Sequence, residues 1–116
     1  FGTPGGDVQC QAMLQLLLNI LLFGMNPQAA IEAPRFASYS FPNSFAPHEA
    51  FPGRLNLEGR IEADVRAALT ARGHDVHMWP DWSPLAGALC LIYQDLERAT
   101  LAGAADPRRP AMAAGY

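Results

Sequence analysis

The chain has 116 residues, half of them hydrophobic, which is the length of about one domain with enough apolar side chains for an ordered core. Its net charge of −3 and pI near 5.5 argue against nucleic acid as the main partner, because nucleic-acid binding usually requires a basic face. All eight basic residues are Arg, and they are not concentrated in one patch.

The first regular element predicted is a helix over residues 8–23. Its polar residues Gln11, Gln15 and Asn19 recur at every fourth position, so they form one narrow stripe on an otherwise apolar helix. A helix this apolar is normally buried, and it is too short and too rich in amides to span a bilayer. We expect Gly24 to end it as a left-handed cap.

A second, short helix is predicted directly afterwards. Asn26 is placed to cap it, Pro27 occupies its first position, and Pro34 stops it. The chain then changes to Phe, Pro and Ser without a helical period. This change predicts a strand at 36–40 and an extended loop as far as Pro52.

The rest of the chain alternates strands with one helix. Strands are predicted at 54–57, 75–79, 86–93 and 99–103, and a polar turn precedes the last of them. The run at 86–93 is almost continuously apolar, as expected of a strand covered on both faces.

An amphipathic helix is predicted at 61–72. Glu62 and Arg66 are spaced to pair at i,i+4, and Gly73 ends the helix. The tail over 104–116 is irregular. With two helices early and strands paired late, the chain is predicted to be layered, as one domain or part of one.

The loop over 2–7 is the segment whose residues suggest chemistry. Gly5 and Gly6 directly precede a helix, so their bare backbone amides lie near free N–H groups and the positive end of the helix dipole. Such a turn suits an anion, or an oxygen that becomes anionic during acyl transfer. A turn whose glycines only supply positive φ is the alternative. Neither a phosphate loop nor a dinucleotide fingerprint is present.

Several blocks of sequence closely resemble the gamma-glutamyltranspeptidase family, and they occur in the family's order over nearly the whole chain. They are residues 2–7, 16–19, 23–35, 73–74, 105–109 and 114–116. The segment over 36–52 is similar to a subgroup of bacterial amidases related to the transpeptidases, oxamate amidohydrolase among them.

The resemblance implies an α+β chain that forms part of an N-terminal-nucleophile hydrolase, a four-layer αββα sandwich made as a self-cleaving precursor. Cleavage frees a Thr that serves as nucleophile and, through its α-amine, as base. Residues 1–116 would be the C-terminal segment of the small catalytic subunit, a part of one domain that is incomplete at its N-terminus. The nucleophile and most substrate-binding residues would lie upstream of Gly2, and Thr3 is not placed to substitute.

The resemblance also assigns roles within the loop. The backbone amides of Gly5 and Gly6 match the family's oxyanion hole, and Pro4 shapes the turn beside them. Asp7 stands where many transpeptidases carry a small hydroxyl residue. Pro4 and Asp7 are therefore candidate substrate-binding residues. The Asp7 carboxylate can cap the helix, and its negative charge near the oxyanion site favours an amidase-type relative.

The implied function is amide cleavage through an acyl-enzyme, with no cofactor and no metal. The expected partners are the large subunit, the N-terminal half of the small subunit and a small-molecule amide, without nucleic acid or membrane; a homo-oligomer stays open. The segment alone is expected to be inactive. A non-catalytic domain or interaction module is the alternative. Because Phe1 is not an initiator Met, localisation stays open between bacterial cytoplasm and periplasm, with the cytoplasm favoured.

Histidine, cysteine and tryptophan residues have structural explanations that we prefer. His74 and His77 point to opposite faces of an extended segment, so a metal pair is not expected. Cys10 and Cys90 lie in apolar runs, which predicts buried free thiols over a disulfide. Trp79 and Trp82 are expected to pack a loop over the sheet. His48 and Glu49 are expected to form a surface pair.

Three charged residues near helix and chain ends have structural explanations. Arg35 follows a helix end and can bind a carboxylate; a structural ion pair with Glu32 or Glu58 is the alternative. Asp106 and Arg108 are predicted to fasten the tail.

Overall fold

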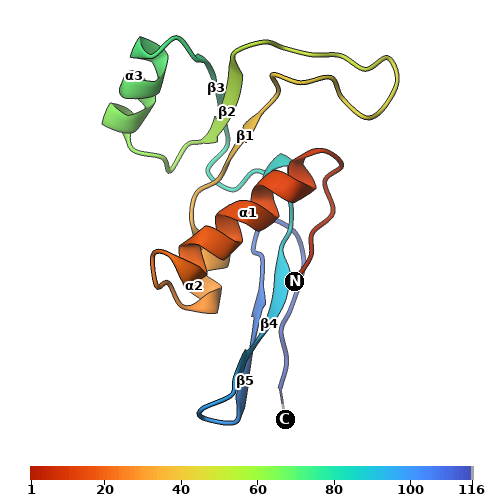
Figure 1. Cartoon of the computed structure of the whole chain (residues 1–116), viewed down its shortest axis with the longest axis vertical. Helices are drawn as coiled ribbons and strands as arrows, with labels where there is room; N and C mark the ends of the chain where they lie inside the picture. Colours follow the sequence, from red (N-terminus) through yellow and green to blue (C-terminus); the bar gives the residue numbers. More distant parts are fainter. Residues whose placement is uncertain (116) are drawn as a thin grey trace.

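The helix α1 (Val8–Leu21) lies between two small sheets in the computed structural model, which describes residues 1–115 (Figure 1). The strands are β1 (Phe36–Ser38), β2 (Arg54–Glu58), β3 (Asp75–Trp79), β4 (Cys90–Asp95) and β5 (Thr100–Ala105). The first sheet has the order β1-β2-β3, with β1 antiparallel and β3 parallel to β2, and β4 and β5 form an antiparallel hairpin. Helices and strands together confirm the α+β class. Tyr116 lies outside the described residues.

The predicted first helix is present, but it ends two residues earlier than expected. Gly24 adopts the predicted left-handed conformation, with a φ of 66°. The Met25 amide then donates to the Asn19 carbonyl at 2.9 Å, which closes the last turn.

The polar stripe of α1 has a purpose that the sequence did not reveal. The Gln11 side chain accepts from the Ser38 amide at 2.8 Å and donates to the Ser38 carbonyl at 3.1 Å. Gln15 makes the same pair of bonds to Phe36, at 3.1 and 3.0 Å. The two amides therefore act as an edge partner for β1, and they satisfy backbone groups that would otherwise lack a strand.

The second helix, α2 (Pro27–Glu32), forms as its sequence predicts. The Asn26 side chain accepts a hydrogen bond from the Ala29 amide at 2.9 Å, and Pro27 occupies the first turn. Ala30 and Ile31 are buried, and they join the larger of two apolar clusters. The members of this cluster come from α1, α2 and the β4–β5 region: Ala12, Leu16, Ala30, Ile31, Leu89, Leu91 and Ala104.

A second, smaller cluster joins α1 to the first sheet. It consists of Val8, Ala37, Trp79 and Ala86. Because α1 contributes to both clusters, its N-terminal end is held from two sides, and the loop that enters it has a fixed support.

The helix α3 (Ala63–Ala71) is shorter than the predicted 61–72, and none of its residues is buried. The expected ion pair between Glu62 and Arg66 is absent from the described part of the chain. The Arg66 guanidinium instead contacts the Met78 sulfur at 3.9 Å, because β3 lies beside the helix.

The apolar run at 86–93 was predicted to be one strand covered on both faces, and this prediction was wrong. A short 3-10 turn, η1 (Pro84–Ala86), and Gly87 with a φ of 88° interrupt it, so that β4 begins only at Cys90. Ile92 is 75% exposed, and Cys90 is also exposed. The prediction of buried thiols was therefore wrong for Cys90, and for Cys10 as well, although both are free.

The outer face of α1 also contradicts the expectation of a buried helix within this chain. Exposed apolar side chains follow one another along it and past its C-terminal end: Leu14, Leu18, Leu21, Leu22 and Phe23. Among residues 1–115, no helix has the length and apolar character needed to cross a membrane.

Candidate functional site

The loop 2–7 enters α1 through two glycines in conformations that L side chains rarely adopt. Gly5 has a φ of 139° and Gly6 a φ of 55°. A Cβ atom at Gly6 would lie 3.1 Å from the Phe45 ring. The backbone conformation therefore favours glycine at both positions, and a side chain at position 6 would also have to displace the Phe45 ring.

The carbonyl groups of the two glycines turn toward the helix. The Val8 amide donates to the Gly5 carbonyl at 3.1 Å, and the Gln9 amide donates to the Gly6 carbonyl at 3.0 Å. No hydrogen bond within residues 1–115 uses the Gly5 or Gly6 N–H as donor. Two backbone donors beside a helix start are thus available to an oxygen that carries negative charge.

The start of the loop is fastened to the segment that leads into β4. Gly2 exchanges two backbone hydrogen bonds with Cys90, each 3.0 Å long. The Thr3 hydroxyl accepts from the Ala88 amide at 2.7 Å and donates to the Pro4 carbonyl at 2.8 Å. The Thr3 hydroxyl therefore connects the loop to this segment.

Asp7 does not cap α1, which corrects the expectation from sequence. Its carboxylate accepts hydrogen bonds from the Ser44 hydroxyl and, at 2.7 Å, from the Ser44 amide, and no side-chain cap bond is made to the helix. These bonds, the hydroxyl first, hold the pKa of Asp7 below its usual value. The carboxylate thus fixes a distant loop beside Gly5 and Gly6.

A hollow of about 360 Å³ opens beside the glycines. Asp7 and Val8 belong to its floor, and its other walls come from three further segments of the chain. Those walls are Tyr39, Asn43, Phe45, Pro84, Leu85 and Arg109. The wall residues Tyr39, Phe45 and Leu85 are apolar or aromatic, and among the described lining residues Arg109 supplies the positive charge. Pro4 is not part of this lining.

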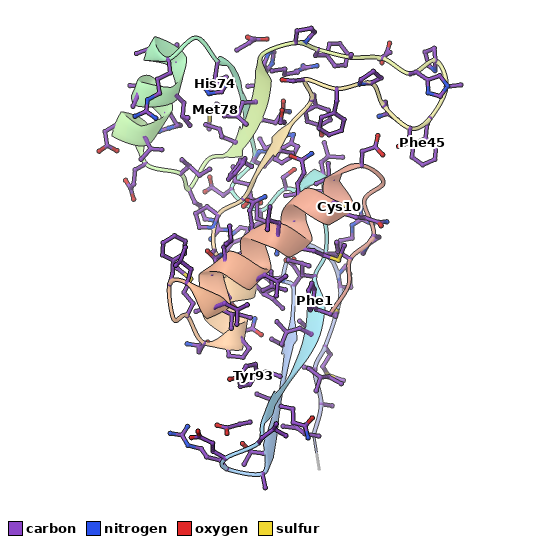
Figure 2. All side chains as sticks on the ribbon, in the orientation of Figure 1. Phe1, Cys10, Phe45, His74, Met78 and Tyr93 are labelled. Carbon is purple, nitrogen blue, oxygen red and sulfur yellow. The ribbon has the colours of Figure 1, made fainter. Side chains whose placement is uncertain are left out.

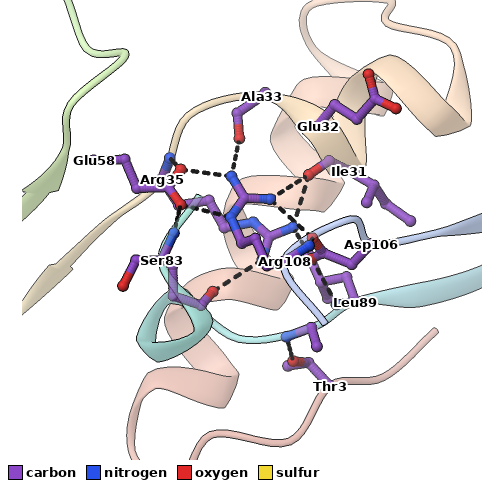
Figure 3. Close-up of polar contacts among 12 residues, drawn as sticks. Thr3, Ile31, Glu32, Ala33, Arg35, Glu58, Ser83, Leu89, Asp106 and Arg108 are labelled. Atoms are coloured by element: carbon purple, nitrogen blue, oxygen red, sulfur yellow. Dashed lines mark hydrogen bonds and ion pairs between the residues drawn. The ribbon is translucent and has the colours of Figure 1, made fainter. Parts of the chain in front are cut away.

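A network of four buried charged residues holds the segment to which Thr3 is hydrogen-bonded (Figure 3). The Arg108 guanidinium binds Glu58 at 2.5 and 2.6 Å and Asp106 at 3.1 Å, and Arg35 pairs with Asp106. All four residues are at most 6% exposed. The network confirms that Asp106 and Arg108 fasten the tail. Arg35, however, forms its ion pair with Asp106; Glu58 accepts from its backbone amide at 2.8 Å.

The network also fixes the segment 83–89, to which the loop 2–7 is bonded. The Ser83 amide donates to Glu58 at 3.0 Å, the Leu89 amide donates to Asp106 at 2.8 Å, and the Arg35 side chain donates to the Ala86 carbonyl at 2.9 Å. These three bonds hold both ends and the middle of 83–89. Thr3 is bonded to the same segment through Ala88, so the network and the loop are connected (Figure 3).

Burial and pairing act in opposite directions on the two acidic groups of the network. Burial alone would raise the pKa values of Glu58 and Asp106. Hydrogen bonds and the positive charges of Arg108 and Arg35 outweigh this effect, so both pKa values lie below their usual range. Both carboxylates are therefore ionised at neutral pH.

The remaining candidates from sequence have structural roles. Trp79 is buried and meets the Tyr39 ring edge-on, with centroids 6.4 Å apart. The Trp82 ring is covered by the Arg60 guanidinium at 3.5 Å. His77 contacts Asp75 at 2.8 Å.

His48 and Glu49 both belong to the exposed loop that carries Phe45. The His48 ring bonds to the Asn43 carbonyl at 2.8 Å, and the Asn43 amide donates to the Glu49 carbonyl, also at 2.8 Å. The two residues therefore shape this loop, and they do not form an acid/base pair with each other.

The fold defines the class of protein. Solved structures that share it include gamma-glutamyltranspeptidases and acylases, so the chain is an α+β part of an N-terminal-nucleophile hydrolase. The gamma-glutamyltranspeptidase family profile matches residues 1–116, and the chain belongs to this family.

Two curated relatives match almost the whole chain. The glutathione hydrolase-like YwrD proenzyme of Bacillus subtilis is 35% identical over 99% of this chain, and the oxamate amidohydrolase proenzyme of Klebsiella pneumoniae is 33% identical over 100%. In each case the chain spans 21% of the relative's length. A solved structure of LmbA2991HD is 40% identical, with a TM-score of 0.87, over 92% of this chain and 19% of the other.

Proposed function

We propose that this chain supplies the oxyanion hole of an amide-cleaving enzyme, with the backbone amides of Gly5 and Gly6 as its donors. The observation that carries the proposal is the pair of N–H groups that donate to no acceptor within residues 1–115, at a helix start and beside a hollow. In acyl transfer, such donors stabilise the negative charge that develops on the carbonyl oxygen.

The nucleophile in this proposal is an N-terminal Thr outside residues 1–116, as in the family, and its α-amine acts as base. Residues 1–116 are then the C-terminal segment of the small catalytic subunit. The large subunit and the N-terminal half of the small subunit complete the site. The chain matches only about a fifth of each proenzyme, and its exposed apolar face on α1 provides a surface for those partners.

Water is the proposed acceptor, so the reaction is hydrolysis of a small amide. The names of the two curated relatives, a glutathione hydrolase-like and an oxamate amidohydrolase proenzyme, support this choice. The Asp7 carboxylate, which Ser44 holds in place, supports hydrolysis as well. Its negative charge disfavours a second anionic ligand near the glycines.

The test is Gly6→Ala in the full-length enzyme. The added methyl group meets the Phe45 ring and disfavours a φ of 55°, so it shifts an amide aimed at the developing charge. We expect kcat for a γ-glutamyl anilide or oxamate to fall about 10²–10³-fold, as when one oxyanion donor is lost, with a smaller change in KM.

Gly24→Ala is the matched control. Gly24 has a similar φ of 66°, open space around its Cα, and a position at the far end of α1. This variant should lose a comparable amount of stability while keeping kcat. If Gly6→Ala kept kcat within about threefold of wild type, equivalent to about 0.7 kcal/mol, the oxyanion assignment would be wrong.

A further inference from the structure

The loop 41–51, called the aromatic loop below, is hydrogen-bonded to the loop 2–7, called the glycine loop. The Asp7 carboxylate accepts from both the amide and the hydroxyl of Ser44. Figure 1 shows the aromatic loop extending from the first sheet toward the entry of α1. The Asp7 side chain at the helix start thus connects two loops through residues that are 37 positions apart in sequence.

The backbone around Phe45 is fixed on both sides. Its amide donates to the Asn43 side chain at 2.8 Å, and its carbonyl accepts from the His48 amide at 2.8 Å. Together with the Ser44 contact, these bonds give the side chain a defined direction, although the loop is at the surface.

The Phe45 ring faces the glycine loop (Figure 2). It lies 3.1 Å from the position of a Cβ at Gly6, yet it is 67% exposed, so it is not a core residue. An aromatic side chain offers a large, rigid apolar surface against which another group can pack. Here the exposed face of the ring adjoins the hollow beside the proposed oxyanion donors.

Phe45 and Leu85 line the hollow beside the two glycines, and both side chains are exposed. During acyl transfer the acyl group stays bonded to the enzyme, whereas the amine leaves toward solvent. The exposed side of the hollow therefore suits the amine half of the substrate. The apolar side chains of Phe45 and Leu85 in its wall favour an apolar or aromatic group on the scissile nitrogen.

We propose that Phe45 is a specificity-determining residue that packs against the leaving amine of the substrate, and that Asp7 is a positioning residue that holds Phe45 there through Ser44. This inference rests on the proposed oxyanion role of Gly5 and Gly6. The substrate class it names is a carboxamide whose nitrogen carries an apolar or aromatic substituent.

The test compares, in the full-length enzyme, amides that differ only on the nitrogen. The probes are γ-glutamyl anilide with γ-glutamyl methylamide, and N-phenyl oxamate with oxamate, so that either acyl group can be accepted. We expect Phe45→Ala to lower the kcat/KM ratio of phenyl to small substituent about tenfold, mainly through KM for the phenyl amide. Phe45→Tyr should keep the ratio, and Phe45→Leu should fall between the two.

Asp7→Ala should reproduce the ratio of Phe45→Ala, and the double variant should show no further fall. Asp7→Asn should restore part of the ratio, because its amide oxygen still accepts from Ser44. A merely structural Asp7 would change kcat for both amides of a pair alike. Phe51→Leu is the matched control in the same loop: its ring lies over Arg54, 4.7 Å from the guanidinium, and the ratio should not change.

The outcomes separate this inference from the function on which it rests. A wild-type enzyme that cleaves none of the four amides overturns the proposed function, and the inference with it. An active wild type whose ratio stays within about twofold in Phe45→Ala and Phe45→Leu overturns only the role of Phe45. If those variants lower the ratio but Asp7→Ala does not, the positioning role of Asp7 is wrong.

Discussion

The Thr3 hydroxyl has both of its hydrogen-bonding roles filled at the entry of the glycine loop. It accepts from Ala88 and donates to Pro4, and a Cβ at Gly87 would lie only 2.7 Å from its oxygen. Gly87 therefore leaves the space that Thr3 needs, and Thr3 fixes the distance between the loop and the segment below it. Neither residue lines the hollow, so the proposed effect of both on the site passes through the backbone of Gly5 and Gly6.

Thr3→Val is predicted to lower kcat in the full-length enzyme by about tenfold with little change in KM. Valine keeps the shape of threonine but leaves the Ala88 amide without its acceptor, which is typically worth about 1–3 kcal/mol for a buried donor. Thr3→Ser, which keeps the hydroxyl, should retain most of the wild-type rate. Equal kcat values for the Val and Ser variants, measured with the same amide, would show that the hydroxyl does not position the loop.

Single residues also show where sequence reasoning ends. The need for glycine at positions 5 and 6 could be predicted, because a helix start and a paired glycine are local features. The partners of Asp7 and Arg35 could not, because Ser44 and Asp106 are 37 and 71 residues away. A carboxylate at a helix start is expected to cap it, but here a tertiary contact competes successfully for the same oxygens.

At the scale of elements, the buried network of four charged residues joins four segments. It connects the end of α2, the end of β2, the turn η1 and the tail that follows β5. Pairing compensates for burial only while every member is present. Removing one partner leaves an unpaired buried charge, which typically costs about 3–5 kcal/mol.

Acid should therefore destabilise the enzyme through Glu58 and Asp106. Folding lowers the pKa values of both groups. Their contribution to stability is therefore complete above the unfolded-state values and is lost as pH falls through the lower folded-state values. Glu58→Gln should lower Tm at pH 7 and make the loss of Tm between pH 5 and pH 3 smaller than in wild type. Glu62→Gln, an exposed carboxylate on the chain before α3, is the control and should follow wild type at each pH. Parallel Tm profiles for Glu58→Gln and wild type would contradict the assignment.

Elements with local signals were predicted well, and those that depend on neighbours were not. Asn26 and Pro27 set the start of α2, and β3 was predicted with its observed bounds, 75–79. The break at Gly87 was missed because apolar residues on both sides of it are buried for different reasons. Ala86, before it, belongs to the cluster shared with the first sheet, whereas Leu89 and Leu91, after it, belong to the cluster shared with α2 and the middle of α1.

At the scale of the molecule, the two sheets and α1 bring together segments that are far apart in sequence. The hollow combines residues from the glycine loop, the aromatic loop, η1 and the tail. Sequence alone located only the glycine loop, and the family resemblance assigned its role. Phe45, Leu85 and Arg109 could be added only once the fold had placed them around it.

The outer face of α1 carries Leu14, Leu18 and Leu21, of which Leu21 is 76% exposed. An apolar row of this kind favours association, and in the full-length enzyme we propose that other parts of the enzyme cover it. A double substitution, Leu14→Gln with Leu21→Gln, should therefore have opposite effects in two contexts. In the isolated segment 1–116 it should reduce self-association and the binding of a hydrophobic dye. In the full-length enzyme it should lower the free energy of unfolding by roughly 1.5–3 kcal/mol for each side chain removed from a covered surface.

The control for this prediction is Val65→Gln. Val65 is 46% exposed on α3, which has no buried residue, so its substitution should change stability by no more than about 0.5 kcal/mol in either context. Light scattering and dye fluorescence measure the isolated segment, and denaturant unfolding measures the full-length enzyme. An unchanged unfolding free energy of the full-length double variant would mean that α1 faces solvent there too. In that case the segment would be an independent module, and the proposed contribution of α1 to the assembly of the catalytic subunit would have to be abandoned.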